Sequence, residues 1–530
     1  MEEVITRISD FFIGFGVGAI SVLENVTDVG NTILWTYVLI GLLLVLGVYF
    51  TIRTKFVQFR YLGEMFRLLG DSPSKGKKGK KGVSSFQAFC ISTASRVGTG
   101  NLSGVALAIT AGGPGAVFWM WLIALIGAAS SFVESTLAQI YKVKDGSSYR
   151  GGPAYYMEKA LNARWMGILF AVLITLCFGF VFNAVQTNTM TNAFQHAFDT
   201  DMLTMGLIVA ALFGLIIFGG VQRIAKVSSV IVPIMATGYV LVALYVMMKN
   251  FTLIPDVIAT IVKHAFGFEQ VAGGAVGAAL MNGIKRGLFS NEGGMGSAPN
   301  AAATAEVSHP VKQGLIQALG VFADTLLICS ATAFIILFSG QQFDVEATNG
   351  IVVTQEALSA QVGSWATSFV AIAILLFAFS SLIGNYYYGE TNIEFITQDK
   401  TWVFLYRFIA IGMVVFGAVA KVELVWNMAD LFMGLMAVTN LIAIALLGKI
   451  AFAALQDYTR QRKAGKDPVF HVDNIPGLKN VECWGTPGSG GDTSGAPSRE
   501  ADVEGSIVAA GSGTIADLTD MEVAAGTTRE

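Results

Sequence analysis

The sequence predicts an all-α polytopic membrane protein, and composition, apolar runs and the placement of positive charges predict it. Of its 530 residues, 54% are hydrophobic and 13% are charged, and the mean hydropathy is +0.61. One soluble core cannot bury so many apolar side chains. Runs of about 20 apolar residues indicate transmembrane helices, and we find about eleven of them.

Nine predicted spans are uninterrupted, and two are long enough but carry polar residues near their middle. The interrupted spans are 84–111 and 270–296. The uninterrupted spans are 34–52, 115–141, 165–190, 202–220, 227–248, 312–338, 365–388, 402–420 and 424–448.

The two ends of the chain differ from this predicted transmembrane domain, 34–455. The apolar stretch "FFIGFGVGAI", 11–20, is too short to span a membrane, so we expect 1–33 to be an N-terminal interfacial segment. The segment 456–530 is rich in glycine and serine and poor in aromatic residues. We expect it to be a cytoplasmic, largely disordered tail.

The loop between the first two spans is strongly basic, and basic loops remain on the cytoplasmic side. We therefore expect a multi-pass protein of the plasma (inner) membrane with its N-terminus outside and its C-terminus in the cytoplasm. Threading the later spans from this start places the other basic loops inside and the acidic loops outside. The basic residues of the first loop are Arg53, Lys55, Arg60, Arg67, Lys75, Lys77, Lys78, Lys80 and Lys81.

The two interrupted spans carry "RVGTGNLSGV", 96–105, and "LFSNEGGMGSAPN", 288–300. Unwound backbone at bilayer depth persists only where protein buries it or where it lines a cavity. The alternative is that the glycines only permit close helix packing. Asn101, Asn291 and Glu292 favour a binding site, because intramembrane polar groups are costly without a function.

These two spans lie five spans apart, so they run in opposite directions. Spans two to six and seven to eleven then form two units of inverted topology, each of which opens with its broken helix, as in repeat-built transporters. We expect the first repeat at about 84–248 and the second at about 270–448.

A broken helix offers two kinds of backbone group. The first half of 84–111 ends with unpaired carbonyls that suit sodium, and its second half begins with N–H groups that suit a carboxylate. This pairing matches an amino acid taken up with sodium. We expect the carboxylate at Thr99, Gly100 and Asn101 and the ammonium near Ser290 and Asn291.

Several further polar residues lie in or near the spans. Gln186 is either part of the substrate site or an interhelical hydrogen-bonding residue, and the sequence favours neither. For the charged residues we expect ion pairs or positions at helix ends in most cases. They are Glu134, Lys285, Arg286, Asp324, Arg407 and Asp430.

Several motifs closely resemble the alanine or glycine:cation symporter family across about 34–455. They are "RVGTGNLSGVALAI", "GGPGAVFWMWLIALIG", "RGGPAYYM", "GGVQRIAKVSS" and "NGIKRGLFSNEGGMGSAPNAAA". The resemblance implies sodium- or proton-coupled uptake of small neutral amino acids, typically alanine or glycine. It also implies a leucine-transporter-like fold of two inverted five-helix repeats, preceded here by one extra helix.

The resemblance also implies a sodium site. In transporters of that fold, two carbonyls at the first break and two adjacent hydroxyl residues form it, which correspond here to Ala94, Val97, Ser380 and Ser381. The alternative for the serines is a hydrogen bond to a carbonyl of their own helix.

We therefore expect sodium-coupled symport of alanine or glycine by alternating access. The expected partners are a small neutral amino acid, sodium and the lipid bilayer, with no nucleic acid and no organic cofactor. Proton coupling or a preference for glutamine are alternatives within the same fold, and an ion channel would normally show repeated short units and a filter sequence. The sequence shows neither a catalytic constellation nor a phosphate-binding loop, so we expect no enzyme.

Overall fold

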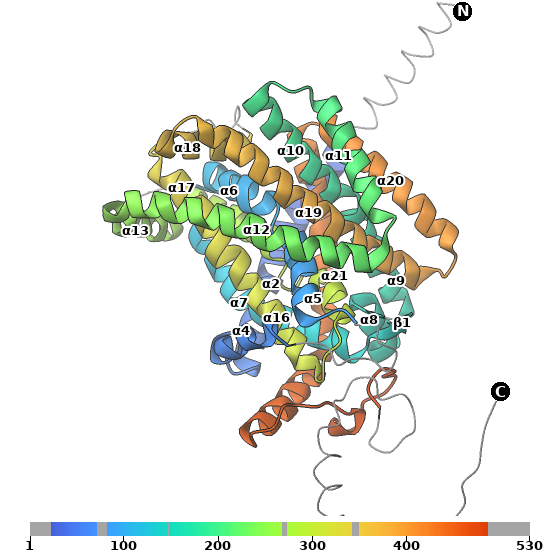
Figure 1. The fold of residues 1–530 in the computed structure, drawn as a ribbon. Coiled ribbons are helices and arrows are strands. Elements are labelled where there is room, and N and C mark those ends of the chain that lie inside the picture. The colour runs from blue at the N-terminus through green and yellow to red at the C-terminus, as the bar shows by residue number, and fades with distance from the viewer. Residues whose placement is uncertain (1–22, 72–81, 147, 268–272, 342–348, 486–530) are drawn as a thin grey trace, which may run out of the picture. The chain divides into compact units, whose positions relative to one another are not determined.

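The computed structural model describes residues 23–71, 82–146, 148–267, 273–341 and 349–485. These residues are mostly helical, and the long helices pack side by side (Figure 1). One short antiparallel hairpin joins β1 (Val143–Asp145) to β2 (Ser148–Arg150). The predicted all-α polytopic class is confirmed.

Within the described residues, eight helices are long and apolar enough to cross a membrane. Three of them contain a π-helical segment, a feature often found at functional sites. The eight are Leu23–Arg53 (with η1, Thr32–Leu39, and α2, Ile40–Arg53), α7 (Ala116–Ile140), α9–η3–α10 (Arg164–Ile174, Thr175–Phe182, Asn183–Phe198), α12 (Gly220–Lys249), α16–η5–α17 (Pro310–Phe322, Ala323–Cys329, Ser330–Phe338), α19 (Trp365–Ile396), α20 (Lys400–Val419) and α21 (Val422–Lys463).

Three further elements complete the eleven predicted spans. They are the shorter α11 (Met202–Ile217) and two broken helices, α5–η2–α6 (Ser85–Arg96, Gly100–Gly104, Val105–Gly112) and α14–α15 (Gly273–Asn291, Ala298–Thr304). The connecting helices are α3 (Val57–Arg60), α4 (Leu62–Leu69), α8 (Pro153–Leu161), η4 (Phe251–Leu253), α13 (Ile254–Phe266), α18 (Gly350–Val362) and η6 (Val472–Asn474).

The second to fifth spans pack against their counterparts, the seventh to tenth. Helix α6 lies on α14, α7 on α16, α10 on α19, and α11 on α20, and several of these neighbours are visible in Figure 1. Each set begins with a broken helix, and the two broken helices are five spans apart. This is the leucine-transporter-like arrangement of two inverted five-helix units with one additional N-terminal helix.

Local chemistry explains where the broken helices begin and stop. Ser84 and Gln87 form a reciprocal capping box that starts α5, and Val97 leaves the helical conformation with ψ 91°. The second break contains Glu292, Gly294 and Gly296 with φ values of 57°, 88° and 92°. Left-handed backbone is unfavourable for most residues and favours glycine, so both glycines belong to the turn rather than to helix packing.

The first span begins earlier than predicted. Its helix starts at Leu23 instead of residue 34, so the expected interfacial segment 1–33 extends too far, and 11–20 lies outside the described residues. Polar residues in 23–33 lower the hydropathy of this part of the helix, so the sequence did not predict it as part of the span. The Thr27 hydroxyl donates to Glu24 O at 2.8 Å, and the Asn31 amide donates to Asn427 O at 3.0 Å.

The expected disorder of 456–530 is wrong for its first part. Helix α21 continues to Lys463, and residues 467–485, here called the C-terminal strap, pack against the bundle. Phe470 N donates to Ser308 O at 2.9 Å, and Trp484 Nε1 donates to Gln139 O at 2.9 Å. Isolated anchors such as Phe470 and Trp484 create no periodic apolar pattern, so composition alone suggested disorder.

Charged groups also hold the strap. Lys312 Nζ lies 3.0 Å from Asp467 of the strap and 2.9 Å from Asp71. Lys142 Nζ lies 5.0 Å from the ring centre of Trp484 and donates to Ala305 O at 2.9 Å. Burial lowers the pKa of Lys142 to about 8. The strap therefore joins α7, α16 and α21 at one end of the bundle.

We predict that Trp484→Ala lowers the melting temperature of the purified protein. The side chain is 7% exposed, and truncation of a buried tryptophan costs about 3 kcal/mol. Trp165, which is 70% exposed, provides the matched control, and Trp165→Ala should have little effect. Equal melting temperatures for the two variants would show that the strap does not stabilise the bundle.

Candidate functional site at the two broken helices

The two breaks face each other inside the bundle. A Cβ atom at Gly100 would lie 3.2 Å from Ser290 Cα and 2.9 Å from Phe289 Cδ1. Thr99, Asn101 and Asn291 are also buried. The structure thus brings together the residues expected to bind a substrate and encloses them.

Side chains occupy the backbone N–H groups of the first break. Gly98 N donates to Asn101 Oδ1 at 2.9 Å, and Thr99 N donates to Gln186 Oε1 at 3.0 Å. Gln186 therefore contacts the break directly from α10 and acts as an interhelical hydrogen-bonding residue as well. Side-chain carboxamide oxygens thus satisfy these two backbone N–H groups.

The second break supplies one hydroxyl and one amide. The Ser290 hydroxyl donates to Asp324 Oδ2 at 2.8 Å, and Asn291 Oδ1 accepts from Gly293 N at 2.9 Å. Asn291 Nδ2 is buried without a hydrogen-bond partner among the described residues. This donor remains available to a ligand.

The expected sodium ligands also converge. The Ser381 hydroxyl lies 2.8 Å from Ala94 O and 3.5 Å from Val97 O, and the Ser380 hydroxyl lies 3.5 Å from Ala94 O. Both serines also donate to Phe377 O in their own helix, at 3.1 and 2.8 Å. Oxygen ligands suit hard cations, so this cluster can hold sodium if the hydroxyl hydrogens turn away.

Asp324 on η5 joins both broken helices. It accepts from Asn101 Nδ2 at 2.6 Å, from Ser290 Oγ at 2.8 Å and from Thr325 Oγ1 at 2.9 Å. From the sequence we expected Asp324, like the other charged residues in or near the spans, to form an ion pair or to lie at a helix end. Its place at the site was missed, because its partners are distant in the sequence.

Glu134 on α7 fixes the backbone of the second break. Its carboxylate accepts from Gly294 N at 3.2 Å and from Asn440 Nδ2 at 2.7 Å, and Asn440 also donates to Gly294 O at 2.9 Å. Among the described residues, neither Glu134 nor Asp324 has an ion-pair partner. Lys285, Arg286, Arg407 and Asp430 follow the expectation of ion pairing.

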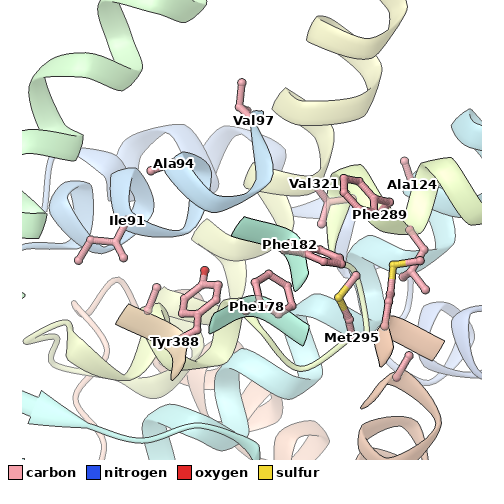
Figure 2. Packing of buried hydrophobic residues seen from close by; sticks show 14 of the residues in the cluster. Ile91, Ala94, Val97, Ala124, Phe178, Phe182, Phe289, Met295, Val321 and Tyr388 are labelled. Carbon is pink, nitrogen blue, oxygen red and sulfur yellow. The ribbon is translucent and has the colours of Figure 1, made fainter. Parts of the chain in front are cut away.

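Aromatic rings and an ion pair cover one side of the site. Ring centres are 4.5 Å apart for Phe182 and Phe289 and 4.7 Å apart for Phe289 and Trp426, and Figure 2 shows Phe178, Phe182 and Phe289 as neighbours. Arg286 lies over Trp426 at 4.6 Å and pairs with Asp430. A ligand between the breaks can leave on this side only if these contacts separate.

Comparison with protein families gives a match over almost the whole membrane domain. A family model described as "sodium:alanine symporter family" matches residues 20–472. A relative from Bacillus subtilis, named "probable sodium/glutamine symporter", is 62% identical over 87% of this chain and 96% of its own length. A relative from Bacillus sp. (strain PS3), named "sodium/proton-dependent alanine carrier protein", is 40% identical over 77% of this chain and 95% of its own length.

Comparison with solved structures finds similar chains at low sequence identity. A manganese transporter from Eremococcus coleocola has a TM-score of 0.49 and 15% identity, over 71% of this chain and 88% of its own. Its arrangement adds nothing to the assignment of the site residues.

We predict that Asp430→Asn destabilises the protein. Asp430 lies 3.3 Å from Lys285 and also pairs with Arg286, and removal of one partner of a buried ion pair costs about 3–5 kcal/mol. Thermal denaturation should show this loss, whereas Asp256→Asn on the exposed face of α13 should change little. The double variant Arg286→Met with Asp430→Leu should regain stability, and a failure to regain it would contradict this explanation.

Proposed function

Because the chain belongs to the sodium:alanine symporter family, we propose that it carries small neutral amino acids, alanine or glycine, together with sodium across the cell membrane. Family membership implies a carrier with sodium as its coupling ion rather than an enzyme. Transport proceeds by alternating access, in which one repeat moves against the other around a central site.

The observation that carries this proposal is the oxygen cluster under the first break. The carbonyls of Ala94 and Val97 meet the hydroxyls of Ser380 and Ser381 within 2.8–3.5 Å. This cluster joins α5 to α19, so a cation there favours one arrangement of the two elements. Such a cation stabilises the substrate site next to it, and the coupling is reciprocal.

The proposed substrate lies between the two breaks. Its carboxylate takes the backbone N–H groups at Thr99, Gly100 and Asn101 after Gln186 moves aside, and its ammonium lies near Ser290 and Asn291. Phe289 packs against Gly100, which supports a small side chain. The burial of these residues supports an occluded state of the transport cycle.

Charge placement supports the proposed orientation. With the N-terminus outside, the basic loop after α2 and the end of α21 lie in the cytoplasm, in accordance with the positive-inside rule. The end of α21 carries Arg460, Arg462 and Lys463. The strap and the first half of the first broken helix then lie toward the cytoplasm.

A second candidate substrate is glutamine. One relative is named for sodium and glutamine at 62% identity, and the unpartnered Asn291 Nδ2 is a buried donor next to the site. A carboxamide oxygen on the substrate would accept from this donor, whereas alanine and glycine have no such oxygen in their side chains. Proton coupling is the other alternative, since one relative is named for sodium and proton together.

Uptake by reconstituted protein tests the function and its sodium site. Radiolabelled alanine, glycine and glutamine are offered to proteoliposomes with sodium and proton gradients imposed separately, and we expect concentrative uptake that requires sodium. Ser381→Ala removes one oxygen and should raise the sodium concentration for half-maximal uptake by about tenfold, within the range of usual coupling energies.

Thr439→Ala is the matched control, because among the described residues that hydroxyl donates only to Leu435 O of its own helix. It should leave the sodium dependence unchanged. Normal sodium dependence in both Ser380→Ala and Ser381→Ala would place the ion elsewhere, and uptake without any ion gradient dependence would argue for a channel.

We predict that Gly100→Ala abolishes substrate binding while Gly104→Ala preserves it. A Cβ at position 100 would lie 2.9 Å from Phe289 and fill the space between the breaks, whereas a Cβ at position 104 would meet Trp426 at an ordinary 3.6 Å. Binding of labelled alanine in saturating sodium measures both variants. Normal binding by a folded Gly100→Ala variant would place the substrate elsewhere.

A further inference from the structure

Buried charges near the two breaks do not balance. Among the described residues around the two breaks, four buried charged side chains lie outside ion-pair distance of any opposite charge. They are Arg96, Glu134, Glu292 and Asp324, three carboxyl groups and one guanidinium. A buried carboxylate without a counter-charge is costly, so protons or bound cations must neutralise part of this charge.

Two of the three carboxyl groups have donors suited to the ionised form. Asp324 accepts from three side-chain donors, and Glu134 accepts from a backbone N–H and from Asn440. Hydrogen bonds of this kind favour a charged carboxylate. Glu292 also has two hydroxyl neighbours, Ser297 and Ser95, but the Ser95 hydroxyl lies equally close to a second acceptor.

The Ser95 hydroxyl lies between two acceptor oxygens at equal distance. Its Oγ is 2.8 Å from Glu292 Oε1 and 2.8 Å from Asn385 Oδ1. A hydroxyl has one hydrogen and can donate it to only one of them. If Glu292 is ionised and the Asn385 amide keeps this orientation, two acceptors face each other across one donor.

A proton on Glu292 removes this conflict. Oε1–H then donates to Ser95 Oγ, and Ser95 donates its own hydrogen to Asn385 Oδ1. On the other side, the Ser297 hydroxyl donates to Glu292 Oε2 at 2.5 Å. Every oxygen in this chain of hydrogen bonds is then satisfied. If the Asn385 amide is turned over, its Nδ2 donates to Ser95 Oγ and Ser95 donates to an ionised Glu292. This rival arrangement predicts no protonated carboxyl group.

Glu292 is buried, and several titratable groups surround it. The buried Tyr388 hydroxyl has no hydrogen-bond partner among the described residues, and in Figure 2 it points toward the helix that carries Ile91 and Ala94. Tyr388 therefore offers a free donor beside Ser95. The titratable and charged groups that face Glu292 are Arg96 on α5, Asp324 on η5, Tyr388 on α19 and Cys177 on η3, with Glu134 of α7 bonded to the same break.

We propose that Glu292 binds one proton and releases it in each transport cycle, at a site separate from the sodium cluster. Ser95 belongs to α5, Asn385 to α19 and Glu292 to the second break, so the protonated form joins three elements. Loss of the proton turns the Ser95 hydrogen toward the Glu292 carboxylate, so the hydrogen bond from Ser95 to Asn385 Oδ1 is lost and the closure of α5 against α19 is weakened. In the proposed orientation this opens the cytoplasmic side, where the proton is released; this proposal rests on the proposed symport.

Infrared spectroscopy tests the protonation without transport. The wild-type protein near neutral pH should show the carbonyl band of a buried, protonated carboxylic acid, and Glu292→Gln should lack it. Asp324→Asn and Glu134→Gln should retain the band. A wild-type protein without such a band, or a Glu292→Gln variant that keeps it, would overturn the proposal whether or not the protein proves to be a symporter.

Proton movement tests the role in transport. Proteoliposomes hold a trapped pH indicator and equal sodium on both sides, with valinomycin and equal potassium to remove the membrane potential, and labelled alanine is added outside. The wild type should acidify the interior, and Glu292→Gln should still take up alanine down its gradient while acidification falls by about tenfold or more. Alanine uptake without acidification in the wild type, or unchanged acidification in Glu292→Gln, would overturn the proposal.

A second variant covers the case in which Glu292→Gln fails to fold. Asn385→Asp keeps the shape of the amide and adds a second carboxyl group next to Ser95, and two neighbouring carboxyl groups share a proton more tightly. The midpoint of the pH dependence of uptake should therefore move to higher pH, by about one unit or more. An unchanged midpoint in this variant would contradict a proton site at Glu292. Loss of sodium-driven uptake in the wild type would instead refute the proposed symport.

Discussion

Unwound backbone at bilayer depth must find hydrogen-bond partners inside the protein, and the rest of this structure depends on that constraint. At the first break, Gln186 and Asn101 accept from backbone N–H groups. At the second, Glu134 and Asn440 bind the two sides of Gly294. The polar side chains of α7, α10 and α21 therefore hold the two breaks in their conformations.

Holding the breaks in this way brings charge into the interior, and that charge sets what the site can bind. Asp324 spans both breaks through Asn101 and Ser290, while Arg96 is a buried cation near them that has no ion-pair partner among the described residues. An excess of buried negative charge favours cations. The proposed sodium cluster and the proposed proton on Glu292 both reduce this excess, although the sodium cluster itself contains no full charge.

The sequence predicted the spans and the two breaks because each leaves a local signal, namely a long apolar run or glycines beside polar residues. It predicted the convergence of Ser380 and Ser381 on the first break only through the family resemblance. Partners that lie far apart in the chain, such as Ser95 with Asn385 or Glu134 with Asn440, leave no local pattern. The C-terminal strap was missed for a related reason, since Phe470 and Trp484 are isolated apolar residues in a polar segment.

The geometry also explains how the two proposed ions and the proposed substrate can act on a single movement. The sodium cluster joins α5 to α19 through Ala94 and Ser381, and Ser95, the next residue along α5, joins α5 to Glu292 and to the same α19. Ala94 and Ser95, consecutive residues of one short helix, thus contact the proposed sodium site and the proposed proton site, respectively. Helix α5 ends at Arg96, directly before the first break, so any shift of that helix changes the break that we propose receives the substrate. A ligand that binds one position of α5 more tightly therefore affects the affinity for the others, without a separate coupling pathway.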